Sequence, residues 1–185
     1  MRTKHVILAL VVFFVSESFS QSKFNAGASF NISVPLGEFS DIAKTGIGGS
    51  INSEYVFSDE LSATFAVYYY SYSSKIPTIA IDGSTYDFSF EAIPIILGLK
   101  YFFNKSFFGT FEAGAHIMRA NADVYNGDNL STDFEIKFGA GLGLGYRMQL
   151  AEASLFEITG VYQYVHDDLS SISLRATVLV LFGNL

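Results

Sequence analysis

The stretch FGAGLGLGYR, from Phe138 to Arg147, decides the fold class. Its even-numbered positions are apolar or aromatic, and its odd-numbered positions from 139 to 145 are all glycine. This period of two predicts a β-strand with one apolar face and one bare face, because successive side chains of a strand point to opposite sides. Glycine loses conformational entropy in a strand and packs nothing. Four glycines on one face therefore indicate tight curvature or a crowded space on that side.

The same alternation recurs along the chain and predicts eight strands, with no competing helix. The expected strands are 24–34, 47–57, 61–70, 86–103, 108–120, 133–146, 154–164 and 171–182. In the fourth strand the apolar positions change phase near Pro94. Since proline cannot donate to a β-ladder, we expect a β-bulge at that position.

The connections between these strands alternate in length. Those at 58–60, 104–106 and 147–153 are short, whereas those at 35–45, 73–85 and 121–132 are long and polar; the last, 165–170, is intermediate. Short turns on one rim and long loops on the other are typical of outer-membrane barrels, whose bacterial single-chain forms have an even strand count starting at eight. The sequence therefore predicts an all-β fold, an eight-stranded antiparallel up-and-down transmembrane β-barrel.

A soluble lipocalin-like barrel would show the same periodicity with its two faces exchanged. The polar face here consists mainly of Gly, Ser, Thr, Asn and Tyr with few lysines, which does not suit a soluble surface. Aromatic residues also gather near strand ends, as in the girdles of membrane barrels. These are Phe57, Tyr101, Phe102, Phe103, Phe107, Phe108, Tyr146 and Phe182. Both features favour the membrane.

The N-terminus combines basic residues at 2 and 4, an apolar run at 6–15 and small residues near Ser20. We expect residues 1–20 to be a secretory signal peptide and residues 21–185 to be an outer-membrane β-barrel domain in the cell outer membrane. An uncleaved anchor is the alternative, but the run is shorter than the about 20 residues that a membrane-spanning helix needs. The chain has no cysteine, so it has no disulfides, and its 18 acidic against 11 basic residues argue against a nucleic-acid partner.

Four segments resemble the small outer-membrane β-barrel proteins of Bacteroidetes, the PorT-like or OmpX-like eight-stranded barrels. They are SVPLGEFSD (33–41), FEAIPIILGLKYFF (90–103), FFGTFEAGAH (107–116) and FGAGLGLGYR (138–147). The resemblance spans nearly all of residues 21–185. It implies an architecture and no particular reaction.

Ionisable residues on the inward face are the candidate functional groups, because such groups in a membrane protein are a functional hypothesis by default. We expect a structural polar network in the lumen, formed by Glu54, Glu91, Glu112, Glu135, Lys137, Glu157 and Arg175. Lys100 and His116 are on the same predicted face. An eight-stranded barrel is just filled by its side chains, and buried charges there must be paired. A proton or ion path is the alternative interpretation.

Other motifs give weak signals. His166, Asp167 and Asp168 precede Ser170 and Ser171, but adjacent loop residues seldom reach the geometry of a hydrolase. The segment 125–133 lacks the spacing and terminal glutamate of a calcium loop, and no lysine and helix follow the glycines as in a phosphate loop. We therefore predict no catalytic, cofactor-binding or metal site.

The expected function is that of a non-enzymatic outer-membrane barrel with a closed lumen, whose long extracellular loops serve binding, adhesion or partner docking. The expected partners are outer-membrane lipid and a protein or surface ligand at the loops. We expect a monomer. A small channel or porin, or a lipid-modifying enzyme, is the alternative.

Overall fold

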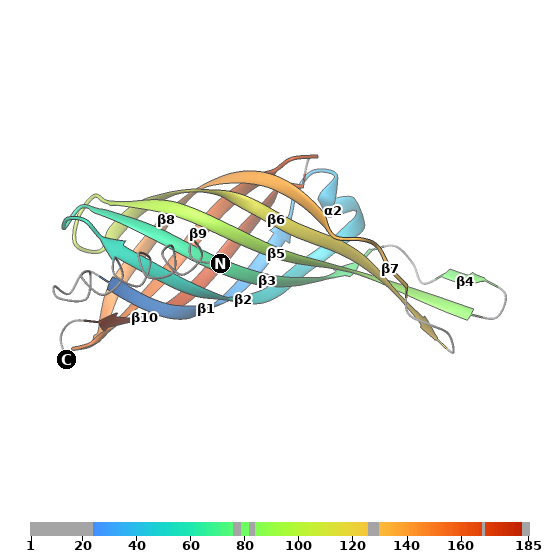
Figure 1. Cartoon of the computed structure of the whole chain (residues 1–185), viewed down its shortest axis with the longest axis horizontal. Coiled ribbons are helices and arrows are strands. Elements are labelled where there is room, and N and C mark those ends of the chain that lie inside the picture. Colours follow the sequence, from blue (N-terminus) through green and yellow to red (C-terminus); the bar gives the residue numbers. More distant parts are fainter. Residues whose placement is uncertain (1–23, 76–78, 82–83, 126–129, 168, 183–185) are drawn as a thin grey trace, which may run out of the picture.

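The computed structural model describes residues 24–75, 79–81, 84–125, 130–167 and 169–182; the predicted signal peptide lies outside them. Eight of the described strands form a closed antiparallel ring (Figure 1). In ring order they are β1 (Phe24–Pro35), β2 (Ala43–Val56), β3 (Leu61–Ser74), β5 (Ser84–Phe102), β6 (Phe107–Tyr125), β8 (Glu135–Ala151), β9 (Ser154–Val165) and β10 (Ser171–Phe182). The pairing of β1 with β10 closes the ring, which confirms the predicted fold.

Short connections join the strands at one end of the barrel, which we call the turn side, and longer ones at the other end, the loop side. At the loop side β5 and β6, each of 19 residues, project beyond the barrel wall (Figure 1). The short strands β4 (Ile79–Ile81) and β7 (Leu130–Ser131) pair with them there.

A short helix, α2 (Phe39–Ile42), lies at the loop side. It lies inside the predicted long connection 35–45 and replaces none of the predicted strands, and its four residues are too few to give a 3.6-residue periodicity in the sequence. The turn begins at Gly37, whose φ of 55° suits glycine. Ser40 and Asp41 then donate their amides to the carbonyls of Gly37 and Glu38. Among the described residues, no helix is long and apolar enough to cross a membrane.

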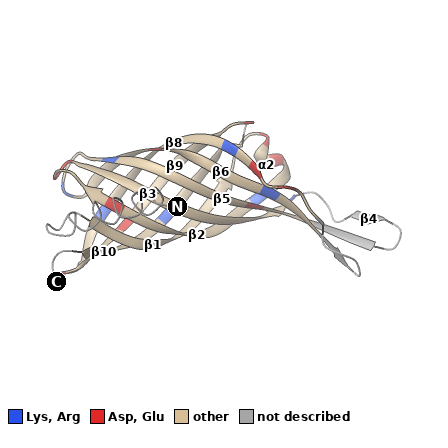
Figure 2. Cartoon of the chain, viewed as in Figure 1, with Lys and Arg blue, Asp and Glu red and all other residues tan. Residues whose placement is uncertain are grey.

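The outer face of the ring is apolar. Each of the eight strands contributes exposed large apolar residues, for example Phe30, Ile47, Phe65, Leu97, Phe111, Leu142, Ile158 and Leu174. In Figure 2 most of the barrel wall is correspondingly free of charged residues. A surface of this kind is stable only against lipid, where an outer-membrane barrel presents an apolar band about 25 Å tall.

The glycines of β8 face the crowded interior, as the alternation predicts. Leu142 and Leu144 are 66% and 69% exposed on the outer face. A Cβ added to Gly143 would lie 2.8 Å from the buried Val161 side chain. One added to Gly145 would lie 2.2 Å from the ring of Phe108, which is fully buried. The bare face of β8 therefore makes room for bulky side chains of other strands.

The expected bulge at Pro94 is wrong. β5 keeps one register with β6 along nearly its whole length, and its pairing with β3 pauses around Pro94 without a shift. Proline interrupts only the hydrogen bonds that its missing N–H would make. The apolar residues on its two sides consequently face opposite directions: Ala92 is buried inside, whereas Ile95 and Leu97 are exposed outside. This alternation moves Glu91 from the predicted lumen position to the outer face.

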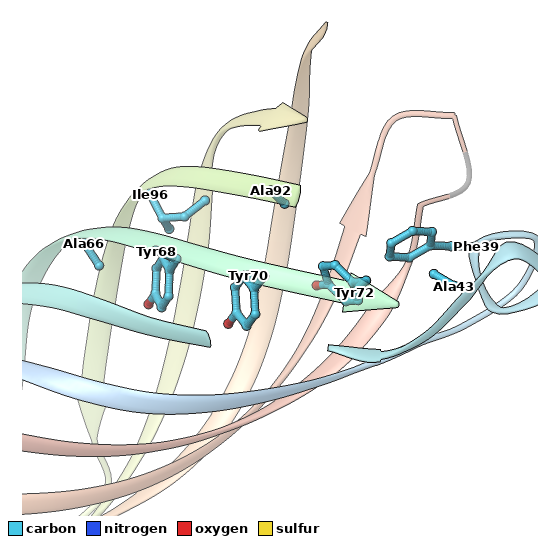
Figure 3. Packing of buried hydrophobic residues seen from close by; sticks show 8 residues of the cluster. All are labelled: Phe39, Ala43, Ala66, Tyr68, Tyr70, Tyr72, Ala92 and Ile96. Carbon is cyan, nitrogen blue, oxygen red and sulfur yellow. The ribbon is translucent and has the colours of Figure 1, made fainter. Parts of the chain in front are cut away.

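Three tyrosines of β3 form a ladder in the barrel interior (Figure 3). Tyr68, Tyr70 and Tyr72 are each at most 5% exposed, with consecutive ring centroids 6.0 Å apart. Phe39 of α2 packs edge-on against Tyr72, with ring centroids 5.1 Å apart. Small residues of neighbouring strands, such as Ala92, leave the space that the rings fill. The helix therefore closes the loop-side end of this ladder.

Aromatic residues form a girdle at the turn side, as the sequence indicates. The contacting pairs are Phe24 with Phe182, Tyr55 with Phe57, Tyr101 with Phe103, and Phe107 with Tyr146. Phe102 and Phe108 do not belong to this girdle, because they alternate with its members and point into the barrel. Their ring centroids lie 5.2 Å apart inside the turn-side end.

Candidate functional site

Two carboxylates and two cations meet in the interior near the turn side. Arg147 contacts Glu54 at 2.5 Å through Nη2 and donates from Nε to Glu157 Oε1 at 2.7 Å. Lys100 Nζ donates to Glu157 Oε2 at 2.6 Å and lies 3.8 Å from Glu54 Oε2. Both carboxylates are at most 2% exposed, so pairing is needed to offset their desolvation.

The aromatic rings of the turn-side interior pack against this cluster. The Arg147 guanidinium lies 4.5 Å from the centroid of the Phe102 ring, and Lys100 Nζ lies 4.9 Å from that of Phe108. Cations are attracted to the faces of such rings. Charge cluster and rings together fill the turn-side end of the lumen.

Arg147 is the interior cation that the sequence interpretation missed, because it was assigned to a turn at 147–153. β8 continues to Ala151, so Arg147 is an inward position in register with the glycines. Extending the alternation of FGAGLGLGYR by one step would have found it.

A second cluster lies in the middle of the lumen around Arg175. Its Nη1 donates to Glu112 Oε1 and to the Tyr68 hydroxyl, each at 2.7 Å, and its Nε donates to Ser173 at 3.2 Å. The guanidinium also lies 4.5 Å from the centroid of the Tyr68 ring. Arg175 therefore joins β10 to β6 and β3 across the barrel interior.

Lys137 and Glu135 lie at the loop-side rim and not in the closed interior where the prediction put them. Glu135 is 70% exposed, and its Oε2 lies 3.3 Å from Lys137 Nζ. Lys137 donates at 2.8 Å to Asp167, a loop residue that is 57% exposed. This hydrogen bond holds the pKa of Asp167 below its usual value. The alternation predicted that Glu135 and Lys137 face inward. Because β8 begins at Glu135, however, the two residues lie at the end of the barrel wall and not inside it.

Glu91 lies on the outer face near the loop side and pairs with Arg119. The Arg119 Nε donates to Glu91 Oε2 at 2.7 Å, and the Tyr69 hydroxyl donates to Oε1 at 2.9 Å. Arg119 also lies 5.1 Å from the centroid of the Phe134 ring. Toward the turn side, the next outward positions of β5 and β6 are the apolar Ile93 and Ile117. The ion pair therefore marks the loop-side limit of the apolar band.

Cavities in the interior are small. One of about 40 Å³ lies between the two charge clusters and is lined by residues including Glu54, Lys100 and Arg175. Another of about 20 Å³ lies beneath α2, between Phe39, His116 and Gln163. The larger has room for about three water molecules and the smaller for about one or two, since a water needs roughly 10–15 Å³ of such space.

A larger pocket of about 260 Å³ opens at the loop side, and we call it the mouth pocket. It is lined by Phe39, Ile42, Phe90, Met118, Arg119, Ala120, Thr132, Glu135, Lys137 and Leu169. The backbone amide of Ala120 donates to the Thr132 hydroxyl, which fastens the segment after β7 along β6. The mouth pocket is therefore assembled from five separate parts of the chain.

The loop residues considered for hydrolysis do not form a nucleophile and base pair in the described part of the chain. His166 is 76% exposed and lies 3.3 Å from Asp167. The Ser170 hydroxyl is paired instead with Tyr162, at 3.5 Å. Asp168 and part of the segment 125–133 lie outside the described residues. Among the described residues, no three metal-ligating side chains gather.

The closed antiparallel ring, apolar outer band and polar interior define a transmembrane β-barrel of the outer-membrane class. The chain is similar in structure to Neisserial surface protein A, with 20% identity and a TM-score of 0.56. It is also similar to Ail, the attachment invasion locus protein of Yersinia pestis, with 13% identity and a TM-score of 0.56. Each likeness covers 86% of this chain and 97% of the other. No protein-family model and no curated protein matches the sequence.

These likenesses establish the fold and not the ligand or partner. Fold and apolar band together confirm the predicted outer-membrane location.

Proposed function

We propose that this chain is a non-enzymatic outer-membrane protein whose lumen is closed and whose loop side faces the cell exterior and docks a partner. The observation that carries the proposal is the filled interior. Two paired charge clusters and the Phe102 and Phe108 rings occupy it, and its cavities measure about 40 and 20 Å³. We propose that the seven predicted lumen residues stabilise the barrel. Glu135 and Lys137 at the rim and Glu91 on the outer face contribute only weakly.

Charge at the loop side indicates the kind of partner. The loop-side segments 36–45, 75–87, 123–135 and 166–170 contain ten acidic residues against two lysines. A surplus of one sign attracts partners of the opposite sign and raises their association rate. The proposed partner is therefore a positively charged protein surface or ligand. The Ail structure contains a heparin analogue, but a sulfated polyanion does not suit the acidic loops of this chain.

Binding of a basic probe tests this proposal. Purified barrel in phosphatidylcholine nanodiscs should bind poly-L-lysine and not heparin, with an affinity that falls as salt is raised. Replacing Asp41 and Asp133 by Asn should weaken binding, whereas replacing the turn-side Asp59 and Glu60 by Asn and Gln should have a smaller effect. Equal effects of the two double variants, or binding of heparin instead, would contradict it.

Two finer assignments are also proposed. The segments at 33–41, 90–103, 107–116 and 138–147 support a place among the PorT-like barrels of Bacteroidetes, and recovery of homologues only from other bacteria would contradict it. Residues 1–20 are proposed to be removed on export, which the intact mass of the mature protein tests. A mass that includes Met1 to Ser20 would refute that cleavage.

A further inference from the structure

The mouth pocket has an apolar wall and a floor that separates it from the lumen. Phe39, Ile42, Phe90, Met118 and Leu169 supply the apolar side chains. Three of these, Phe39, Met118 and Leu169, also line the 20 Å³ cavity beneath, so they lie between the two spaces. A volume of about 260 Å³ lies just below the roughly 300 Å³ at which pockets for drug-sized ligands begin. The pocket therefore suits a fragment-sized molecule that binds and does not pass through.

Two cations line the rim, but each is already paired with a carboxylate that does not line the pocket. Lys137 donates to Asp167 at 2.8 Å, and Arg119 contacts Glu91 at 2.6 Å. Glu135, by contrast, lines the pocket itself and has only the longer contact of 3.3 Å with Lys137. Its 70% exposed side chain is the charge at the rim that is most available to a ligand.

The surrounding segments have the same sign as Glu135. Among the described loop-side residues the carboxylates outnumber the cations, so the potential at the mouth attracts cations and repels anions. The carboxylates are those of Glu38, Asp41, Glu91, Asp133, Glu135 and Asp167, and the cations are those of Lys44, Lys75, Arg119 and Lys137. We propose that the mouth pocket binds a small organic cation with an apolar or aromatic body, of the arylalkylamine class, whose ammonium group pairs with Glu135. This inference names a ligand class for the loop-side binding proposed above. It rests on that proposed function, because the pocket has a floor only if the lumen is closed.

The aromatic side chains of the wall suit such a body. The Phe39 and Phe90 rings meet edge-on, with centroids 6.5 Å apart and an interplanar angle of 76°. A third ring is accommodated well by an edge-to-face pair, and ring faces attract cations. Met118 beside them is flexible and adjusts to ligands of different shape. Apolar contact supplies the affinity in this arrangement, and the carboxylate selects the charge.

Calorimetric titration of the barrel in phosphatidylcholine nanodiscs with 4-phenylbutylammonium tests the proposal, with empty nanodiscs subtracted. We expect saturable binding of this cation and none of 4-phenylbutyrate, which has the same body and the opposite charge. Glu135→Gln should raise the dissociation constant about two- to fivefold, the range expected for a largely exposed ion pair. Ala120→Trp should abolish binding by filling the pocket.

Glu38→Gln is the matched control, because it removes one exposed loop-side charge from outside the pocket lining. It should change the dissociation constant less than twofold. Absence of saturable cation binding, equal binding of 4-phenylbutyrate, or equal effects of the two glutamine variants would overturn the proposal. If Ala120→Trp does not fold, the two ligands and the Glu135→Gln variant still decide the matter. Conductance of the same protein separates the two proposals: a closed barrel that fails to bind refutes only the ligand site, and an open barrel refutes the closed lumen.

Discussion

At interior positions the neighbouring side chains limit the size of the residue that fits, and Gly145 is the clearest example. The Phe108 ring lies where a Cβ of residue 145 would be, with a closest approach of 2.2 Å. Gly145→Val should therefore destabilise the barrel by about 1 to 3 kcal/mol through overpacking. Gly160→Ala is the matched control, because its added Cβ would meet nothing within 4 Å. Urea unfolding in lipid vesicles, followed by circular dichroism, measures both, and a Gly145→Val barrel as stable as the control would contradict the packing.

Among the interior charges, Arg147 matters most for stability because it contacts two buried carboxylates, Glu54 and Glu157. Arg147→Met should cost about 3 to 5 kcal/mol, since it leaves buried carboxylate charge uncompensated. Lys137→Met should cost about 0 to 1 kcal/mol, because its partners at the rim are exposed and screened by water. The same unfolding assay compares them. A larger loss for Lys137→Met would show that the rim, and not the turn-side cluster, bears the essential ion pairs.

At the scale of elements, alternation predicted the strands and their faces well but failed where one strand changes its surroundings. The outward Leu142 and inward Gly143 of β8 follow directly from the period of two. In β5 the apolar residues face inward on the loop side of Pro94, where they pack under α2 and the tyrosine ladder, and mainly outward on its turn side. The sequence shows that the apolar positions change phase at Pro94. It does not show whether the strand bulges there or whether the apolar side chains pass from its inner face to its outer face. The position of Glu91 was wrong for this reason.

The mouth pocket could not be predicted from any one strand. Its walls come from α2, β5, β6, the segment around β7 and the loop before β10, and no periodic pattern relates these segments. The charge clusters could be predicted in part. The alternation placed Glu54, Glu112, Glu157 and Arg175 on the inward face, but it did not show which partner each would meet. Pairing depends on the ring order and strand register, which only the three-dimensional structure supplies.

The depth of β8 in the membrane gives a prediction for this element. Leu142→Arg should cost about 2 to 4 kcal/mol, because position 142 faces lipid in the middle of the strand. Met148→Arg, on the same face near the turn side, should cost about 0 to 1 kcal/mol, because charge is tolerated near the interface. Unfolding in vesicles measures the difference. Equal costs would mean that the apolar band is not centred on this part of the barrel.

At the scale of the whole molecule, an eight-stranded ring encloses a space that side chains can fill, whereas aqueous porins use 16 to 18 strands. Here the turn side is filled by the Arg147 cluster with Phe102 and Phe108, the middle by Arg175 and the tyrosine ladder, and the loop side by Phe39. Under the proposed function, these three successive obstructions leave the loop-side surface, and not the lumen, as the place where ligands bind.

Planar-bilayer recording of the purified protein tests the closed lumen most directly. A variant with both Phe102→Ala and Phe108→Ala serves as a positive control, because it removes the rings from the turn-side end and should conduct more than the wild type. The wild-type barrel is expected to give a quiet baseline without steady single-channel steps. Large, steady, single-channel steps from the wild type would mean that the lumen is open, and a small channel would then replace the closed barrel.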